Sequence, residues 1–344
     1  MKLVVALAAL SLASSDAAPT AIPSEAYSHP QRLVVVDGKR RLNVFCQGQG
    51  APMVLFDAGL GDSNMSWRYV QGEVAKGMRA CSYDRAGLGF SDAPLGASDV
   101  TSSVEDIHRL LKALKADQPI VYVGHSIAGL YGVVLQGRYP GDVAAEVLVD
   151  PSFADQAEKS ADAYYWPSAR PIADDDPPPQ VQQMKVCLAL AKAGALRMPK
   201  TEEARGCVGV DPSFDAVLKR VKEAQRKDPK VISATISEEM SFAPSGPDLT
   251  SVDRVQVEAT NAQFDHKPLI ILTAGNMPAS QDADPAQAKR VSDAWIAGHE
   301  RLAALSKRGS HTVVPNSQHY IQIDQPKAVI AAIEKAVAAV RNKP

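Results

Sequence analysis

The sequence predicts an α/β fold, in which helices cover both faces of a mostly parallel sheet and an insertion interrupts the pattern. Short apolar runs rich in β-branched residues alternate with segments of helical periodicity, and short connections join them. Between residues 153 and 262 this alternation stops, so we place the insertion there. With 344 residues, 45% of them hydrophobic, the chain is long enough for one large core and an inserted subdomain.

The first four predicted strands come before residue 84. Arg32–Val36 and Arg41–Cys46 alternate around Asp37-Gly38, a pair typical of hairpin turns. Apolar runs at Pro52–Phe56 and Arg79–Tyr83 predict strands buried on both faces. A glycine-rich turn follows each of these two strands.

The second glycine-rich turn is not a dinucleotide-binding loop. Its Gly87-Leu88-Gly89 begins the right spacing, but Asp92 stands where the third glycine belongs, and no helical pattern opens directly behind it. An amphipathic helix, Val104–Ala116, comes later and leads into the next strand.

That strand, Ile120–Val123, runs directly into Gly124-His125-Ser126-Ile127-Ala128-Gly129. This pattern predicts a strand, a tight turn and a helix, with Ser126 at the apex between small residues. The motif usually written G-x-S-x-G has Ala128 at its last position here, and Gly129 one place later. Because the helix N-terminus behind the turn favours a developing negative charge, Ser126 is a candidate nucleophile.

The remaining elements complete the alternation. A strand at Glu146–Val149 ends at Asp150, and the insertion contains two helical patterns, Val181–Leu196 and Phe214–Lys227. The later elements are a strand at Pro268–Thr273, a helix at Pro285–Ser306, a strand at Thr312–Val314 and a helix at Pro326–Val340. In such sheets, sites lie beyond the carboxyl ends of the strands.

His319 is the candidate general base. A serine hydroxyl is a weak nucleophile at neutral pH, and an imidazole is well suited to take its proton. Of the seven histidines, His319 is the one in the loop between a strand and the final helix. Such a base needs a carboxylate that fixes its tautomer and stabilises the imidazolium.

These motifs resemble the α/β-hydrolase superfamily over about residues 32–152 and from residue 264 to the C-terminus. The matching pieces are Asp57–Gly61, Tyr83–Ser91, the turn at Ser126 and Ser317–Tyr320. The resemblance implies an eight-stranded sheet with a helical lid, and a triad in the order Ser, acid, His. It also implies an oxyanion hole formed by the backbone N–H groups of Leu60 and Ile127. The expected organisation is a signal peptide at 1–17, a flexible leader at 18–30, a core at 31–152 and 263–344, and a lid at 153–262.

The acid of this triad has more than one candidate. The usual place in the family is the loop after Pro268–Thr273, but Asp282 and Asp284 come late in that loop. Asp150, at the end of the strand that follows the serine turn, matches an alternative placement seen in some members. We favour Asp150 and keep Asp282 and Asp284 as alternatives.

An aromatic cluster in the expected lid is a candidate substrate pocket. Tyr164, Tyr165 and Trp166 stand together and would suit an apolar acyl or aryl group, although such a cluster can also form the lid's own core. The fold and pattern imply neither a metal nor an organic cofactor.

The first 17 residues have the pattern of a secretory signal peptide. Lys2 precedes an apolar run from Leu3 to Ala13, and Ser15 and Ala17 stand at positions −3 and −1 of a cleavage site. The run is too short to span a bilayer, which takes roughly 20 residues. We therefore expect an exported protein, periplasmic or secreted, that is not stably inserted in a membrane.

Export allows the four cysteines to pair. Four cysteines permit three connectivities, and we expect a local Cys187–Cys207 disulfide. Cys46 and Cys81, each at the end of a predicted core strand, are a candidate second pair. No C-x-x-C occurs, so a zinc or redox site is not expected.

Taken together, the motifs predict a serine hydrolase that cleaves an ester-like bond in a small-molecule substrate. Peptidase, lactonase, thioesterase or perhydrolase activity would use the same machinery, and a non-catalytic binding protein is the alternative from another class. A formal net charge of −2 favours neither nucleic acid nor an anionic membrane surface. The sequence does not predict an oligomeric state.

Overall fold

The structure is a computed structural model that describes residues 19–156, 177–244, 250–276 and 285–342. The expected signal peptide at 1–17 therefore lies outside the described residues. The same is true of Tyr164, Tyr165 and Trp166, and of the alternative acids Asp282 and Asp284.

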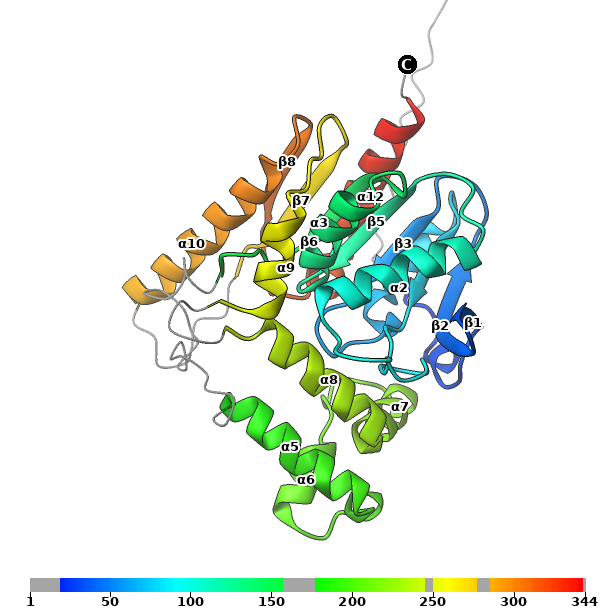
Figure 1. Ribbon diagram of the computed structural model, residues 1–344, viewed down its shortest axis with the longest axis vertical. Coiled ribbons are helices and arrows are strands. Elements are labelled where there is room, and N and C mark those ends of the chain that lie inside the picture. Colours follow the sequence, from blue (N-terminus) through cyan, green and yellow to red (C-terminus); the bar gives the residue numbers. More distant parts are fainter. Residues whose placement is uncertain (1–18, 157–176, 245–249, 277–284, 343–344) are drawn as a thin grey trace, which may run out of the picture.

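An eight-stranded sheet forms the centre of the molecule, with the strand order β1-β2-β4-β3-β5-β6-β7-β8 (Figure 1). The first two pairings, β1 with β2 and β2 with β4, are antiparallel, and the others are parallel. The strands are β1 (Leu33–Asp37), β2 (Arg40–Gln47), β3 (Val54–Asp57), β4 (Ala80–Tyr83), β5 (Ile120–His125), β6 (Val143–Val149), β7 (Leu269–Ala274) and β8 (Gly309–Val314). The predicted fold class is confirmed.

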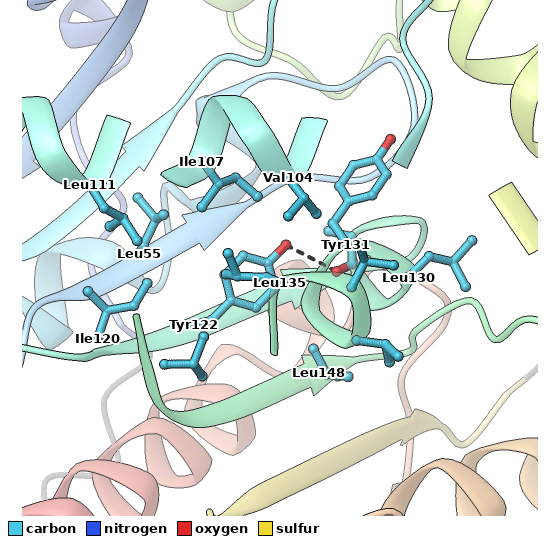
Figure 2. Close-up of a cluster of buried hydrophobic side chains, with 14 of the residues drawn as sticks. Leu55, Val104, Ile107, Leu111, Ile120, Tyr122, Leu130, Tyr131, Leu135 and Leu148 are labelled. Carbon is cyan, nitrogen blue, oxygen red and sulfur yellow. Dashed lines mark hydrogen bonds between the residues drawn. The ribbon is translucent and has the colours of Figure 1, made fainter. Parts of the chain in front are cut away.

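Helices cover both faces of this sheet. On one face, α2 (Val100–Ala113), α3 (Ala128–Arg138), α9 (Val252–Thr260) and α10 (Pro285–Ala303) contribute to a large apolar cluster. Figure 2 shows part of it, where Val104 and Ile107 from α2 approach Tyr122 on β5 (Figure 2). On the other face lie α1 (Gln71–Val74), α11 (Ile321–Asp324) and α12 (Pro326–Arg341). The short 3₁₀ helices η1 (Ser24–Tyr27) and η2 (Asn64–Trp67) precede α1.

The inserted region contributes further helices, which we call the cap helices. They are α5 (Pro179–Lys192), η3 (Ala195–Arg197), α6 (Glu202–Val208), α7 (Ala216–Lys227), α8 (Pro229–Phe242) and α9. In Figure 1, α8 lies next to the sheet, whereas α5 and α6 lie farther away (Figure 1). The sequence pattern indicated two helices here, at Val181–Leu196 and Phe214–Lys227. It missed α8 because that helix buries polar as well as apolar side chains, among them Glu238 and Glu239, which obscures the periodicity.

Two disulfides are present, and no cysteine is free. Cys46–Cys81 joins paired residues of β2 and β4, and Cys187–Cys207 joins α5 to α6 across a sequence separation of 20 residues. Closing a loop of this length stabilises the folded state by about 3 kcal/mol on the chain-entropy model. No described helix is long and apolar enough to cross a membrane.

Candidate active site

Ser126 lies on a tight turn between β5 and α3. Its φ angle is +56°, in the left-handed region that residues other than glycine rarely adopt. Its backbone N–H donates to the carbonyl of Val149 over 3.1 Å, and its own carbonyl accepts from the N–H groups of Gly129 and Ser152, each over 2.8 Å. The strained turn is therefore held by β6 as well as by α3.

The glycine after the motif's last position explains why alanine is tolerated at position 128. A Cβ atom on Gly129 would lie 2.4 Å from the Cβ atom of Pro151, closer than real side chains approach. Close packing against the β6 turn thus needs glycine at 129, whereas the methyl group of Ala128 is accommodated in the core.

Three side chains from separate loops form a hydrogen-bonded chain. The hydroxyl Oγ of Ser126 lies 3.0 Å from Nε2 of His319, and Nδ1 of His319 lies 2.7 Å from Oδ2 of Asp150. Both distances are within the range in which a nucleophile, a base and an orienting carboxylate work together. The structure thus brings together the three residues that the sequence analysis favoured, whereas the alternative acids fall outside the described residues.

The other oxygen of Asp150 is held by two donors. Oδ1 accepts from the backbone N–H of Ala274 over 2.9 Å and from Nε1 of Trp295 over 3.0 Å. One turn later on α10, Nε2–H of His299 donates to the carbonyl of Pro151 over 2.7 Å. Helix α10 therefore fixes both the carboxylate and the backbone that follows it.

These contacts determine the charge of Asp150. Burial alone would raise the pKa of this carboxyl, but the hydrogen bond from His319 and the nearby histidine charges outweigh burial, and the pKa is lowered. Asp150 is therefore ionised at neutral pH.

We expect Trp295→Phe to destabilise the protein by about 1.5–3 kcal/mol at neutral pH, because it removes a hydrogen bond to a buried carboxylate. A carboxyl whose pKa is lower in the folded protein stabilises it above the unfolded pKa of about 3.9, and this stability is lost as the pH falls through the folded pKa. Without the Trp295 donor, folding lowers the pKa of Asp150 by less than it does in the wild-type protein. The difference in unfolding free energy from wild type should therefore shrink between about pH 7 and about pH 3.

Urea unfolding followed by circular dichroism measures this difference. Trp67→Phe is the matched control, because Trp67 is fully buried and its Nε1 has no hydrogen-bond partner among the described residues. Its effect should not depend on pH. An equal, pH-independent effect of both substitutions would contradict the role given to Trp295.

The loop that follows β3 passes directly over the serine. A Cβ atom on Gly59 would lie 3.4 Å from the Cβ atom of Ser126 and 2.8 Å from Nδ1 of His125. The next residue along this loop is Leu60, and Ile127 is the N-cap of α3. Among the described residues, neither backbone N–H donates a hydrogen bond, so both are free to bind an oxyanion.

A buried network fixes this loop. The guanidinium of Arg85 donates to the carbonyls of Ala58 and Gly59, over 2.6 and 2.7 Å, and is ion-paired with Asp57 and Glu238. Glu238, on cap helix α8, also accepts from the N–H of Gly61 over 2.8 Å. The cap and the loop over the serine are therefore held by one set of charges. No sequence motif predicted the role of Glu238.

His125, beside the serine, holds the backbone of His319. Its Nε2–H donates to the backbone carbonyl of His319 over 2.9 Å. Burial, together with the nearby charge of His319, lowers the pKa of His125 to about 3, so this ring is uncharged at neutral pH. The sequence motif leaves its second position open, so this role was not predictable from it.

A cavity of about 920 Å³ opens beside the site. Leu60, His319 and Tyr320 line it, together with Met65 and Arg68 and with residues of the cap helices, including Cys187 and Cys207. Such a volume suits a small or medium-sized organic ligand. Among the described residues, no group of three or more His, Cys, Asp or Glu side chains could hold a metal ion.

Comparison with known proteins agrees with the fold. The sequence profile described as "Alpha/beta hydrolase family" matches residues 54–332. The uncharacterized protein YqjL of Bacillus subtilis is 28% identical over 131 residues, 37% of this chain and 50% of that protein. The probable esterase PIR7A of Oryza sativa subsp. indica is 36% identical over 104 residues, 29% of this chain and 39% of that protein. The chain thus spans half or less of the length of these curated relatives.

A solved structure shows the same fold. An alpha/beta hydrolase fold protein from Burkholderia ambifaria matches with a TM-score of 0.57 at 18% identity, covering 89% of this chain and 99% of that one. At this identity the likeness concerns the fold alone.

Proposed function

Because this chain belongs to the alpha/beta hydrolase family, we propose that it is a serine hydrolase that cleaves an ester bond through an acyl-enzyme intermediate. The observation that carries the proposal is the chain of hydrogen bonds from Ser126 through His319 to Asp150. The substrate is small or medium-sized and partly apolar, in keeping with the size of the neighbouring cavity.

The first half of the reaction forms the acyl-enzyme. Oγ of Ser126 attacks the ester carbonyl carbon as Nε2 of His319 takes the hydroxyl proton. Asp150 stabilises the imidazolium, and the N–H groups of Leu60 and Ile127 bind the oxyanion. The tetrahedral intermediate then collapses, the bond to the alcohol oxygen breaks, and His319 returns its proton to the departing alcohol.

Water completes the reaction by the same route. His319 takes a proton from a water molecule as the water oxygen attacks the acyl carbon. The second tetrahedral intermediate breaks its bond to Oγ, and the proton returns to Ser126. The products are a carboxylic acid and an alcohol, and the enzyme is restored without a metal or an organic cofactor.

We also propose that the enzyme works after export. Two disulfides are consistent with an oxidising compartment, where thiols can pair and remain paired. The signal peptide at 1–17 and the lid boundaries at 153–262 stay predictions.

A panel of p-nitrophenyl esters of increasing acyl length tests the proposed activity, with peptide anilides and lactones as controls. We expect p-nitrophenol release to be fastest with one class of short or medium acyl chain, and the controls to react far more slowly. Turnover of peptide anilides without turnover of any ester would show instead that the same machinery cleaves amides.

A further inference from the structure

One buried arginine that lines the cavity has no carboxylate partner among the described residues. Among the described residues, three arginines are more than nine-tenths buried: Arg40, Arg68 and Arg85. Arg40 pairs with Asp37 and Asp106, and Arg85 pairs with Asp57 and Glu238. Arg68 forms no ion pair with a described residue. The one hydrogen bond that its guanidinium makes there is a long one, 3.4 Å, to the carbonyl of Met65.

Arg68 is nevertheless placed where a ligand can reach it. It follows η2 directly and lines the same cavity as Leu60 and His319. Its guanidinium carbon lies 4.6 Å from the ring centre of Tyr69 and 5.5 Å from that of Phe214, which also lines the cavity. The rings stabilise a cation there and limit its movement, but they leave its N–H donors unused.

The other charges of the cavity either have partners among the described residues or, like Arg226, lie exposed. Lys222 lies 3.4 Å from Asp62, which also accepts from the hydroxyl of Tyr320 over 3.0 Å. Asp324 accepts from the backbone N–H of Gln318, and Asp211 from that of Ser213.

Two acids lie near enough to interact electrostatically with Arg68 without forming an ion pair with it. Asp211 and Asp215 both have lowered pKa values, chiefly because of hydrogen bonds from serines, with Arg68 as a lesser cause. Both are exposed, and Asp215 is further occupied as the N-cap of α7. The guanidinium is therefore a buried cation with unused donors facing a cavity, an arrangement that is unfavourable unless an anion completes it.

We propose that Arg68 binds a carboxylate carried by the substrate, so that the enzyme prefers esters that also bear a free acid group. The proposal rests on the proposed function, since it assigns the substrate class of the same site. A carboxylate fits better than a phosphate because one buried unpaired cation balances one negative charge, and the planar guanidinium matches a carboxylate through two parallel hydrogen bonds.

Matched ester pairs test this preference. Mono-p-nitrophenyl adipate and suberate carry the acid on the acyl side, and 4-acetoxyphenylacetate carries it on the alcohol side. Each is compared with its methyl ester, which has nearly the same shape and no charge. We expect kcat/KM of the wild-type enzyme to be about 10- to 100-fold higher for the acid than for the methyl ester in at least one pair.

Substitution then assigns the preference to Arg68. Arg68→Gln should abolish most of the preference in kcat/KM for the acid over the methyl ester. Arg68→Lys keeps the charge but lacks the planar guanidinium, so it should retain part of that preference. Arg220→Met is the matched control, because Arg220 is an exposed arginine of α7 that does not line the cavity. It should leave the ratio unchanged. A ratio near one in wild type for every pair, or a ratio that Arg68→Gln does not lower, would overturn the proposal.

A binding measurement separates this proposal from the catalytic one. In protein carrying Ser126→Ala, calorimetry with monomethyl suberate and dimethyl suberate should show about tenfold or greater preference for the monoacid, lost on adding Arg68→Gln. If that preference is present but no ester is hydrolysed by wild type, the proposed function fails and the carboxylate site stands. If esters are hydrolysed without any acid preference in rate or binding, the carboxylate site fails and the proposed function stands.

Discussion

Ser126→Ala is expected to lower kcat for ester hydrolysis by about 10⁴- to 10⁶-fold, because the members of a triad act as a unit. The hydroxyl that attacks the carbonyl carbon is absent, and His319, 3.0 Å away, has no proton to take. Steady-state kinetics with the best p-nitrophenyl ester of the panel measure the loss.

The substitution should leave the fold intact. Alanine adopts the positive φ of residue 126 at much the same strain as serine, and the backbone hydrogen bonds to Val149, Gly129 and Ser152 do not involve the side chain. Circular dichroism and the urea midpoint check this. Retention of even a tenth of the wild-type kcat would rule out Ser126 as the nucleophile.

Asp150→Asn is expected to lower kcat by about 10⁴-fold, and the structure shows why an amide of the same shape fails. The Oδ1 position of Asp150 accepts two N–H groups, from Ala274 and Trp295, so the amide oxygen of asparagine must take that place. Its NH₂ group then faces Nδ1 of His319, which becomes an acceptor. The proton of the neutral ring moves to Nε2, and that nitrogen can no longer accept the proton of Ser126.

Asp282→Asn and Asp284→Asn serve as matched controls, because both remove a carboxylate from the family's usual position for the acid. We expect mild effects from each. Nitrogen NMR of the labelled ring should show His319 protonated at Nδ1 in wild type and at Nε2 in Asp150→Asn. Near-normal kcat in Asp150→Asn, together with a large loss of kcat in Asp282→Asn or Asp284→Asn, would place the acid after β7.

Much of the fold was predictable because its signals are local. The strands buried on both faces are short β-branched runs, and the turn at Ser126 needs small residues that are adjacent in the chain. Position in that pattern was also enough to propose His319 and to favour Asp150 over Asp282 and Asp284, since the ends of parallel strands meet at one edge of the sheet.

The residues that support the site were not predictable in this way, because their contacts join distant parts of the sequence. Trp295 lies 145 residues from Asp150, and Glu238 lies 153 residues from Arg85. Arg68 was missed for another reason: an arginine after a tryptophan carries no signal until the fold shows that it is buried without a carboxylate partner among the described residues.

The most direct test of the account is reaction with a fluorophosphonate, which phosphonylates a serine only where a base and an oxyanion hole activate it. Intact-mass spectrometry should show one added phosphonyl group per chain, and peptide mapping should place it on Ser126. Protein carrying Ser126→Ala should remain unlabelled under the same conditions. Wild-type protein that stays unlabelled, or a label that forms equally well in the variant, would contradict the assignment of this site as a serine hydrolase.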